Sequence, residues 1–187
     1  DHKALLEMAK NNPGKFTYPA PPDFTGSAFV RNIIYDIVGY EQFLTMDADY
    51  DTVKSAIMPA MDYLKELKPY LWNEGKTYPA SLSILDNMYA DGEVFMTMDY
   101  NPNSASSRIS TGEFPDATKT FIFDKGSIGN THFVAIPFNS PNVEGAKAVI
   151  NEIISVEAQA KKYDPSGWGD LPVLDNSKLS DDEKKVF

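Results

Sequence analysis

Cysteine is absent from this sequence of 187 residues, and histidine occurs only twice. Without cysteine the chain cannot form disulfides, bind zinc through thiolates or attack a substrate with a thiol. Two histidines are too few to favour a transition-metal site, so we expect neither a metal nor another cofactor. Long apolar runs are also missing, since none approaches the roughly 18 residues that a membrane-spanning helix needs.

Positive charge is scarce as well. The 17 Lys and Arg side chains against 27 Asp and Glu give a net charge of −10, which disfavours nucleic acid and anionic membranes as partners. An apolar fraction of 42% is that of a globular protein, and we expect one domain, with pieces of a second. The stretch from Asp1 to Lys10 already reads as helix without an initiator methionine. We therefore expect an excerpt of a longer protein, with any export signal upstream.

Apolar residues recur every three or four positions in several segments, which predicts amphipathic helices. The helix over Ser27–Val38 is the best specified, because Gly39 follows it as a C-terminal cap. A longer helix over Asp51–Trp72 is expected to contain a kink at Pro59. The other predicted helices are Ala80–Gly92 and one that opens at Ser140 with Pro141 in its first turn.

Short apolar runs bounded by turn residues alternate with these helices and predict strands. The run Glu93–Tyr100 has adjacent apolar residues and is expected to be buried on both faces. The remaining predicted strands are Lys15–Pro19, Thr120–Phe123 and His132–Pro137, and the tail from Asp164 is expected to be an extended surface segment. Strands that alternate with helices predict an α/β fold, a mixed, mostly parallel sheet with helices on both faces.

Several catalytic and metal-binding motifs fail on inspection. The Gly75-Lys76-Thr77 triplet resembles the end of a P-loop but follows a helix and lacks the first glycine. Three aspartates between 47 and 51 have calcium-loop spacing, but the required glycine and final glutamate are missing. No Gly-x-Ser-x-Gly turn is present. We therefore expect a binding protein and not an enzyme.

The strongest candidate for a ligand site is the turn between the first predicted strand and the helix that follows. A helix that begins at the carboxyl end of a strand directs its first backbone N–H groups toward the sheet edge where ligands bind in open α/β folds. The candidate residues of this turn are Asp23, Phe24, Thr25, Gly26 and Ser27. Plain helix capping explains Asp23, Thr25 and Ser27 equally well, and both interpretations stay open.

A second candidate follows the buried strand. Tyr100 and Asn101 combine an aromatic face with an amide, which suits a polar organic solute. Asn130 and Trp168 are weaker candidates of the same kind. The structural alternative is a strand-ending turn with a half-buried tyrosine.

Four segments together resemble the bacterial extracellular solute-binding proteins of ABC importers, in the YnjB-like branch of the periplasmic binding protein type II superfamily. They are NNPGKFTYPAPPDFTGSAFVR, GEVFMTMDYNPN, GSIGNTHFVAIPFNSPNVEGAKAVINEIISVEAQ and WGDLPVLD, in this order. The resemblance implies two α/β lobes that close on a small solute and present it to a membrane permease. It implies that Asp23–Ser27, Tyr100 and Asn101 face the cleft and that Asp124–Asn130 is a hinge crossing.

The resemblance also implies an organisation and a location. Residues 1–125 correspond to the second, C-terminal lobe, residues 126–187 to the hinge return strand, a helix and the tail, and the first lobe is absent from this chain. The expected location is periplasmic or extracellular. A protein held at the cell surface by a lipid anchor on a missing N-terminus is one version of this expectation. The surface left by the missing lobe, around Phe133–Phe138, is expected to favour dimerisation.

Two functions of other classes compete with solute capture. An α/β hydrolase-like enzyme would use His132 with Asp23 or Asp99 as its base. An interaction module would display the Pro19-x-x-Pro22 spacing to an aromatic groove of a partner domain.

Overall fold

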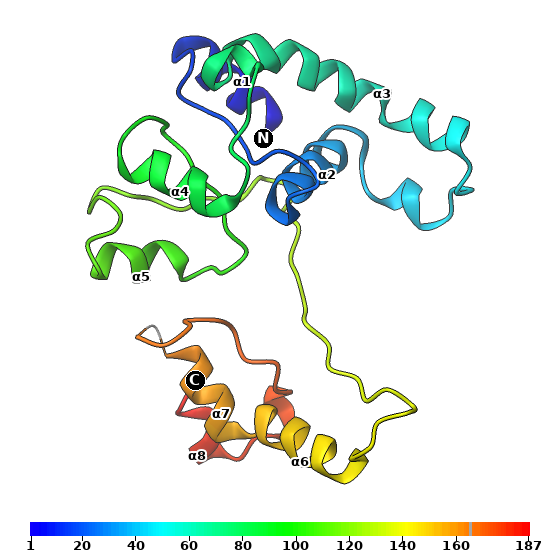
Figure 1. Cartoon of the computed structure of the whole chain (residues 1–187), viewed down its shortest axis with the longest axis vertical. Helices are drawn as coiled ribbons and strands as arrows, with labels where there is room; N and C mark the ends of the chain where they lie inside the picture. Colours follow the sequence, from blue (N-terminus) through cyan, green and yellow to red (C-terminus); the bar gives the residue numbers. More distant parts are fainter. Residues whose placement is uncertain (165) are drawn as a thin grey trace. The chain divides into compact units, whose positions relative to one another are not determined.

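The computed structural model describes residues 1–164 and 166–187, and its regular structure there is helical (Figure 1). Its α-helices are α1 (His2–Asn11), α2 (Phe24–Val38), α3 (Tyr50–Leu67), α4 (Leu82–Ala90), α5 (Ser104–Ser110), α6 (Val143–Ile153), α7 (Val156–Tyr163) and α8 (Asp181–Lys184). Short 3-10 helices are η1 (Glu41–Leu44), η2 (Lys68–Tyr70), η3 (Trp72–Gly75) and η4 (Asn176–Lys178). No strand occurs in these residues, so the predicted α/β sheet is wrong.

The chain divides into two compact units. Unit 1 comprises Asp1–Asp99 and Lys119–Ile128, and unit 2 comprises Tyr100–Thr118 and Gly129–Phe187. Unit 1 contains α1 to α4, and unit 2 contains α5 to α8. The predicted division of the chain near residue 125 stays a prediction.

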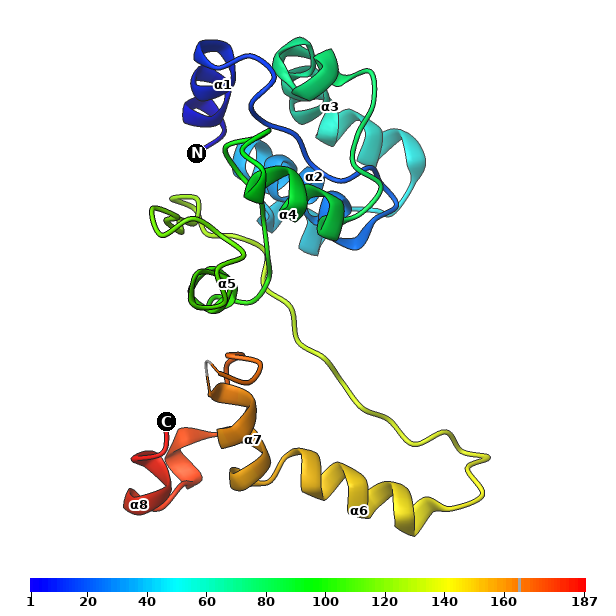
Figure 2. The same cartoon turned by 60° about the vertical axis from the view of Figure 1, so that its left-hand side comes forward.

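The core of unit 1 forms where α2 packs against α1 and α3 (Figures 1 and 2). Ile33 of α2 and Leu67 of α3 are completely buried, and each such side chain stabilises the fold by about 1.5–3 kcal/mol. The buried members of this core are Leu5, Leu6, Ala9, Phe16, Tyr18, Ile33, Ala60, Tyr63, Leu67, Leu71 and Phe123. They come from α1, α2 and α3, the extended segment after α1, the junction between η2 and η3, and the crossing segment near residue 123.

Helix periodicity predicted α2, α3, α4 and α6, and the expected helix over Asp1–Lys10 is found as α1. α2 contains the predicted Ser27–Val38 helix and ends at Gly39, as expected. α3 contains Pro59 but stops at Leu67, because the following Lys68-Pro69-Tyr70 turn is a 3-10 helix. α6 begins at Val143 with Asn142 as its cap, so Pro141 precedes the helix instead of lying in its first turn.

The segment predicted as the first strand is extended and buried but pairs with no single neighbour. Gly14 N–H donates to Tyr70 O, and Trp72 N–H donates to Phe16 O. Phe95 N–H donates to Lys15 O, and Ala20 N–H donates to Pro79 O. A sheet ladder requires successive bonds to one partner strand, whereas these bonds go to three separate stretches of chain. The alternating pattern therefore marks a buried extended segment and not a strand.

The other predicted strands expose much of their apolar surface. Val94 is buried, but its neighbour Phe95 is 51% exposed, so this run is not covered on both faces. Phe121 and Ile122 are exposed beside the buried Phe123. Phe133 is 89% exposed. The polar stretch after Asn103 holds α5, and the tail holds η4 and α8, which hydrophobic periodicity did not predict.

α2 lies close to the backbone of the extended segment at Gly26. A Cβ added to Gly26 would lie 1.9 Å from the carbonyl oxygen of Pro19. Pro19 itself is fully buried. Because that oxygen belongs to the backbone of a buried residue, it cannot move aside cheaply, and only glycine fits at position 26.

We predict that Gly26→Ala lowers the free energy of unfolding by about 3 kcal/mol, since the added methyl group overpacks the α2 contact. Urea unfolding followed by circular dichroism measures this. Gly129→Ala is the matched control, because a Cβ there meets nothing within 4 Å. The control is expected to change stability by less than about 1 kcal/mol. Equal effects of the two substitutions would contradict the close-approach explanation.

Candidate functional site

The first turn of α2 is capped by the side chain of Asp23. Its Oδ1 accepts hydrogen bonds from the backbone N–H groups of Thr25 and Gly26, both at 2.9 Å. The next N–H group, of Ser27, donates to the carbonyl oxygen of Asp23 at 2.8 Å. Such a cap stabilises a helix by about 1 kcal/mol. The N–H groups of Thr25, Gly26 and Ser27 are therefore used inside the helix.

Exposure divides the five candidates of this turn into two groups. Thr25 and Gly26 are buried. Phe24 is 60% exposed, and Asp23 and Ser27 are half-buried. Phe24, Asp23 and Ser27 are therefore the residues of this turn with surface left for a solute.

Aromatic packing holds the segment before this turn. The ring of Tyr18 stacks on Phe29 of α2 at a centroid distance of 4.5 Å and contacts Tyr78 at 5.1 Å. Burial raises the pKa of Tyr18, and Tyr78 raises it further, so Tyr18 remains protonated at neutral pH. The full burial of Pro19 also removes it from a partner's reach, which disfavours the docking-peptide hypothesis.

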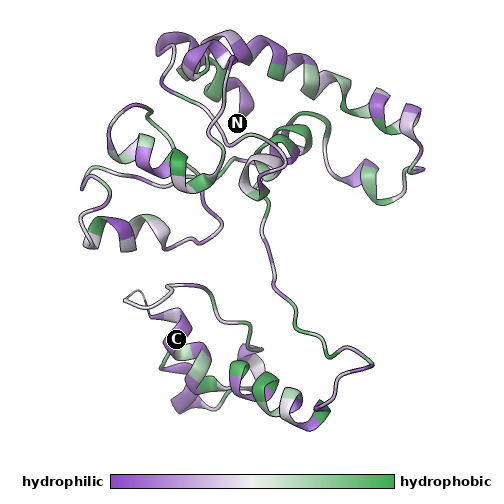
Figure 3. Cartoon of the chain, in the orientation of Figure 1, coloured by the Kyte–Doolittle hydropathy of each residue, from purple (hydrophilic) through white to green (hydrophobic). Residues whose placement is uncertain are grey.

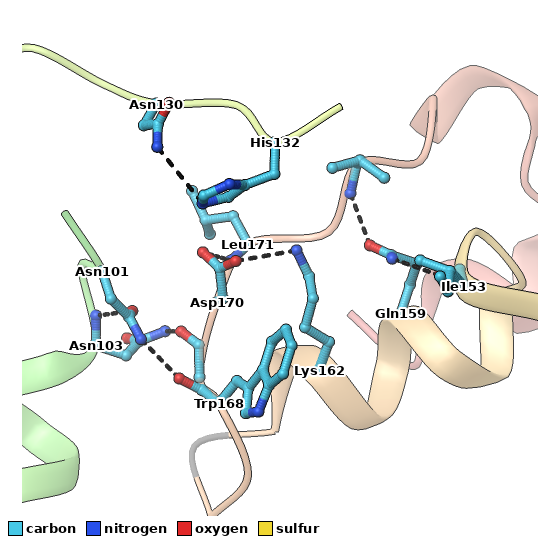
Figure 4. Close-up of polar contacts among 12 residues, drawn as sticks. Asn101, Asn103, Asn130, His132, Ile153, Gln159, Lys162, Trp168, Asp170 and Leu171 are labelled. Carbon is cyan, nitrogen blue, oxygen red and sulfur yellow. Dashed lines mark hydrogen bonds and ion pairs between the residues drawn. The ribbon is translucent and has the colours of Figure 1, made fainter. Parts of the chain in front are cut away.

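The second group of candidates belongs to unit 2 (Figure 4). Asn101 Nδ2 donates to the carbonyl oxygen of Trp168 at 2.6 Å, and Asn101 Oδ1 accepts from Asn103 N–H at 2.9 Å. Asn103 Nδ2 donates in turn to Gly169 O. The Asn101 amide thus anchors the loop that carries Trp168. The Trp168 side chain itself is 71% exposed, and Tyr100 is half-buried.

Two further side chains position this loop from α7. Lys162 Nζ lies 3.1 Å from Asp170 Oδ2, and Gln159 Oε1 accepts from Val173 N–H at 2.9 Å (Figure 4). Gln159 is buried and also donates to Ile153 O at 2.8 Å. Sequence reasoning missed Asn103, Gln159 and Lys162, because no local pattern distinguishes them. The supporting role of a buried glutamine such as Gln159 can be recognised only when its hydrogen-bond partners are known.

Asn130 lies beside the one interior histidine. Its Nδ2 is 3.4 Å from His132 Nε2, and both residues are exposed. The hydrolase hypothesis pairs His132 with Asp23 or Asp99, which belong to unit 1. The capping bonds of Asp23 already use one of its carboxylate oxygens.

Two hydrogen bonds join the expected hinge crossing, Asp124–Asn130, to α2. Lys125 Nζ donates to Asp36 O at 2.6 Å, and Ile128 N–H donates to Asn32 Oδ1 at 3.0 Å. The Asp36 side chain is 3% exposed, and its Oδ2 accepts from His2 N–H at 2.8 Å and lies 2.5 Å from His2 Nδ1. This network joins α1, α2 and the crossing segment.

The charge state of Asp36 follows from these contacts. Burial by itself would raise the pKa of Asp36. The hydrogen bonds and charge of His2, together with the Lys125 ammonium, outweigh burial and hold this pKa below its usual range. Asp36 is therefore a carboxylate in the folded protein at neutral pH.

The described part of the chain contains neither a cluster of possible metal ligands nor a membrane-spanning helix. Within residues 1–164 and 166–187, no three His, Asp or Glu side chains gather closely enough to hold a metal ion. No helix in the same ranges has the length and apolarity needed to cross a bilayer.

Comparison with known proteins gives a consistent result. The family model described as bacterial extracellular solute-binding protein matches residues 1–186. Protein YnjB of Escherichia coli (strain K12) is 41% identical over 183 residues, which cover 98% of this chain and 47% of YnjB. The chain thus spans about half the length of this curated relative. No solved structure matches significantly.

We predict that Asp36→Asn lowers the free energy of unfolding by about 2–3 kcal/mol at pH 7, since it removes the carboxylate charge that His2 contacts and that the nearby Lys125 ammonium favours. A carboxyl with a lowered folded-state pKa stabilises the fold above its unfolded-state pKa of about 3.9 and loses this effect as pH falls through the folded-state value. The gap between wild type and Asp36→Asn should therefore close in acid.

Urea unfolding at several pH values measures this gap. In a Trp168→Phe background the fluorescence comes from Trp72, which lies in unit 1 with Asp36. Asp62→Asn is the control, because the Asp62 side chain is 65% exposed and pairs with Lys65 on its own helix. It is expected to cost less than about 0.5 kcal/mol. A gap for Asp36→Asn that widens in acid would refute the assignment.

Proposed function

The chain belongs to the bacterial extracellular solute-binding proteins, and from this membership we propose that it forms part of the substrate-binding component of an ABC importer. In this role it captures a small polar solute outside the cytoplasm, in the periplasm or at the cell surface, and delivers it to a membrane permease. The observation that carries the proposal is the family match, which extends over nearly the whole chain. Residues 1–125 would contribute the C-terminal lobe and residues 126–187 the return segment and tail.

Solute capture needs no catalytic residue. A solute that binds the closed form of a two-lobed protein better than the open form shifts the equilibrium by that difference in affinity. The polypeptide corresponding to the other half of YnjB would supply the first lobe. The permease then distinguishes the closed, loaded form from the open one.

We propose that Asp23, Phe24 and Ser27 contact the solute from unit 1. The capping bonds to Thr25 and Gly26 engage Asp23 Oδ1 and leave Oδ2 available as an acceptor. An acceptor beside an exposed aromatic ring suits a solute with hydroxyl, amide or ammonium donors and an apolar body. An anionic solute is disfavoured there, because Asp23 would repel it. Thr25 and Gly26 support the turn from inside.

In unit 2 we propose that Trp168 and Tyr100 offer ring faces to a solute, and that Asn101 positions the Trp168 loop. Asn130 would add an exposed amide beside His132. These contacts have the chemistry of a site for a polar organic molecule, in which ring stacking and hydrogen bonds fix orientation.

Asp23 variants separate helix capping from solute binding. Asparagine caps a helix about as well as aspartate, whereas alanine loses about 1 kcal/mol. We predict that Asp23→Asn leaves the free energy of unfolding unchanged but weakens solute affinity about tenfold or more, whereas Asp23→Ala lowers both. A tenfold loss corresponds to about 1.4 kcal/mol of binding free energy.

The measurement uses the complete gene product. A thermal-shift screen of amino acids, amines, polyols and organic acids first identifies a stabilising solute, which calorimetric titration then quantifies. Glu41→Gln, at an exposed acid beyond the far end of α2, is the control for general charge effects. Unchanged solute affinity in Asp23→Asn, Phe24→Ala and Trp168→Ala together would exclude the proposed contacts.

We also propose that this chain self-associates through the extended segment around Phe133–Phe138. Phe133 is 89% exposed, Val134 60% and Phe138 102%, a run of apolar surface that water solvates poorly. We predict a concentration-dependent rise in mass by light scattering. The Phe133→Ser/Phe138→Ser variant should remain monomeric. The control variant Phe95→Ser/Phe121→Ser should still self-associate as the wild type does. A wild-type chain that is monomeric at high concentration would contradict this prediction.

A further inference from the structure

The loop after α7 carries an exposed tryptophan on a backbone held by hydrogen bonds. The Trp168 side chain is 71% exposed. Gly167 N–H and Gly169 N–H both donate to Asp164 O, at 2.8 and 3.0 Å. Gly169 has a φ of 63°, a left-handed conformation that residues with a Cβ rarely adopt. Residues 166–169 are pale in Figure 3, as expected for side chains of intermediate hydropathy, so hydrogen bonds and backbone geometry set the course of this loop.

Two asparagines from the start of unit 2 hold this loop, and we call Asn101 and Asn103 together the asparagine clasp (Figure 4). Asn101 Nδ2 donates to Trp168 O at 2.6 Å, and Asn103 Nδ2 donates to Gly169 O. Asn103 N–H donates to Asn101 Oδ1 at 2.9 Å, which fixes the two amides relative to each other. Two successive carbonyl groups of the loop are thus bound by two side chains that are themselves joined.

The asparagine clasp joins stretches of unit 2 that are far apart in the sequence. Asn101 and Trp168 are 67 positions apart, and Lys119–Ile128 between them belongs to unit 1. Asn103 occupies the N-cap position of α5, where asparagine is a favoured residue, but among the described residues its side chain makes no capping bond. Its amide binds the Trp168 loop instead. This use of the amide indicates that Asn103 serves the loop and not its own helix.

We propose that the asparagine clasp fixes the Trp168 ring before a solute arrives, and that Asn103 is a positioning residue for solute capture. An aromatic side chain that is already held in place binds a solute more tightly, because binding does not have to order it. Asn103 acts through the ring and need not touch the solute. The effect on affinity rests on the Trp168 contact proposed above, whereas the fixed position of the ring is tested without solute.

Fluorine NMR of the complete gene product, labelled with 5-fluorotryptophan, tests the position of the ring. The resonance of Trp168 is the one that Trp168→Phe removes, and Trp72→Phe identifies a reference signal from unit 1. Asn103→Asp keeps the size of the side chain but replaces the donor amide by an acceptor. Asn176→Asp, at an exposed asparagine of η4, is the matched control. We expect Asn103→Asp to shift and narrow the Trp168 resonance and to leave Trp72 unchanged, and the control to change neither signal.

Solute affinity supplies the second test, with the compound of the thermal-shift panel that stabilises the wild type most. We expect Asn103→Asp to weaken its binding about three- to tenfold, because binding must then order the ring. In a Trp168→Ala background the same substitution should weaken binding no further, since Asn103 acts through the ring. The control Asn176→Asp should bind as the wild type does.

Three results would overturn the proposal. One is a Trp168 resonance that Asn103→Asp leaves unchanged, and another is a change of the Trp72 signal in the same variant, which would show that the substitution disturbs the whole protein. The third is a loss of affinity from Asn103→Asp that adds to the loss from Trp168→Ala. Wild-type affinity in Trp168→Ala alone would instead refute the ring contact, and with it the positioning role of Asn103, even where the fluorine spectra confirm the clasp.

Discussion

The close approach of α2 to the extended segment at Gly26 and Pro19 is the contact on which unit 1 depends. It allows α2 to contact both α1 and α3, and it places the first turn of α2 directly after a buried stretch of chain. The Asp23 cap satisfies the backbone donors of that turn. The exposed chemistry at this point therefore comes from side chains and not from the helix backbone.

Much of the helical structure could be predicted from the sequence. The three- and four-residue spacing of apolar side chains identified α2, α3, α4 and α6, because a helix that packs on a core presents one continuous apolar face. Short elements without such a face, such as α5 and α8, left no periodic signal. The sheet was predicted wrongly, because alternation shows only that a segment is extended and half-buried. Whether it forms a ladder depends on a partner segment, and the bonds of residues 14–20 go to separate stretches of chain.

The candidate site was predictable to a similar degree. The pattern at Asp23–Ser27 located an aromatic ring, a hydroxyl and a carboxylate at the start of one helix, but it could not tell which atoms face solvent. The structure resolves this for Thr25 and Gly26, which are buried, and for Phe24, which is exposed. Asn103, Gln159 and Lys162 support the Trp168 loop through contacts between distant residues, for which no local signal exists.

Membership in the solute-binding family and the half-buried carboxylate of Asp23 together support the proposal that this protein holds a small polar solute that carries hydrogen-bond donors. Native mass spectrometry of the complete gene product, purified gently without added ligands, tests it most directly. The predicted result is a stoichiometric mass increment from one small, neutral or cationic polar molecule that is lost on denaturation. A stoichiometric anionic solute, or an apo mass that no compound in a broad solute library changes, would contradict the account.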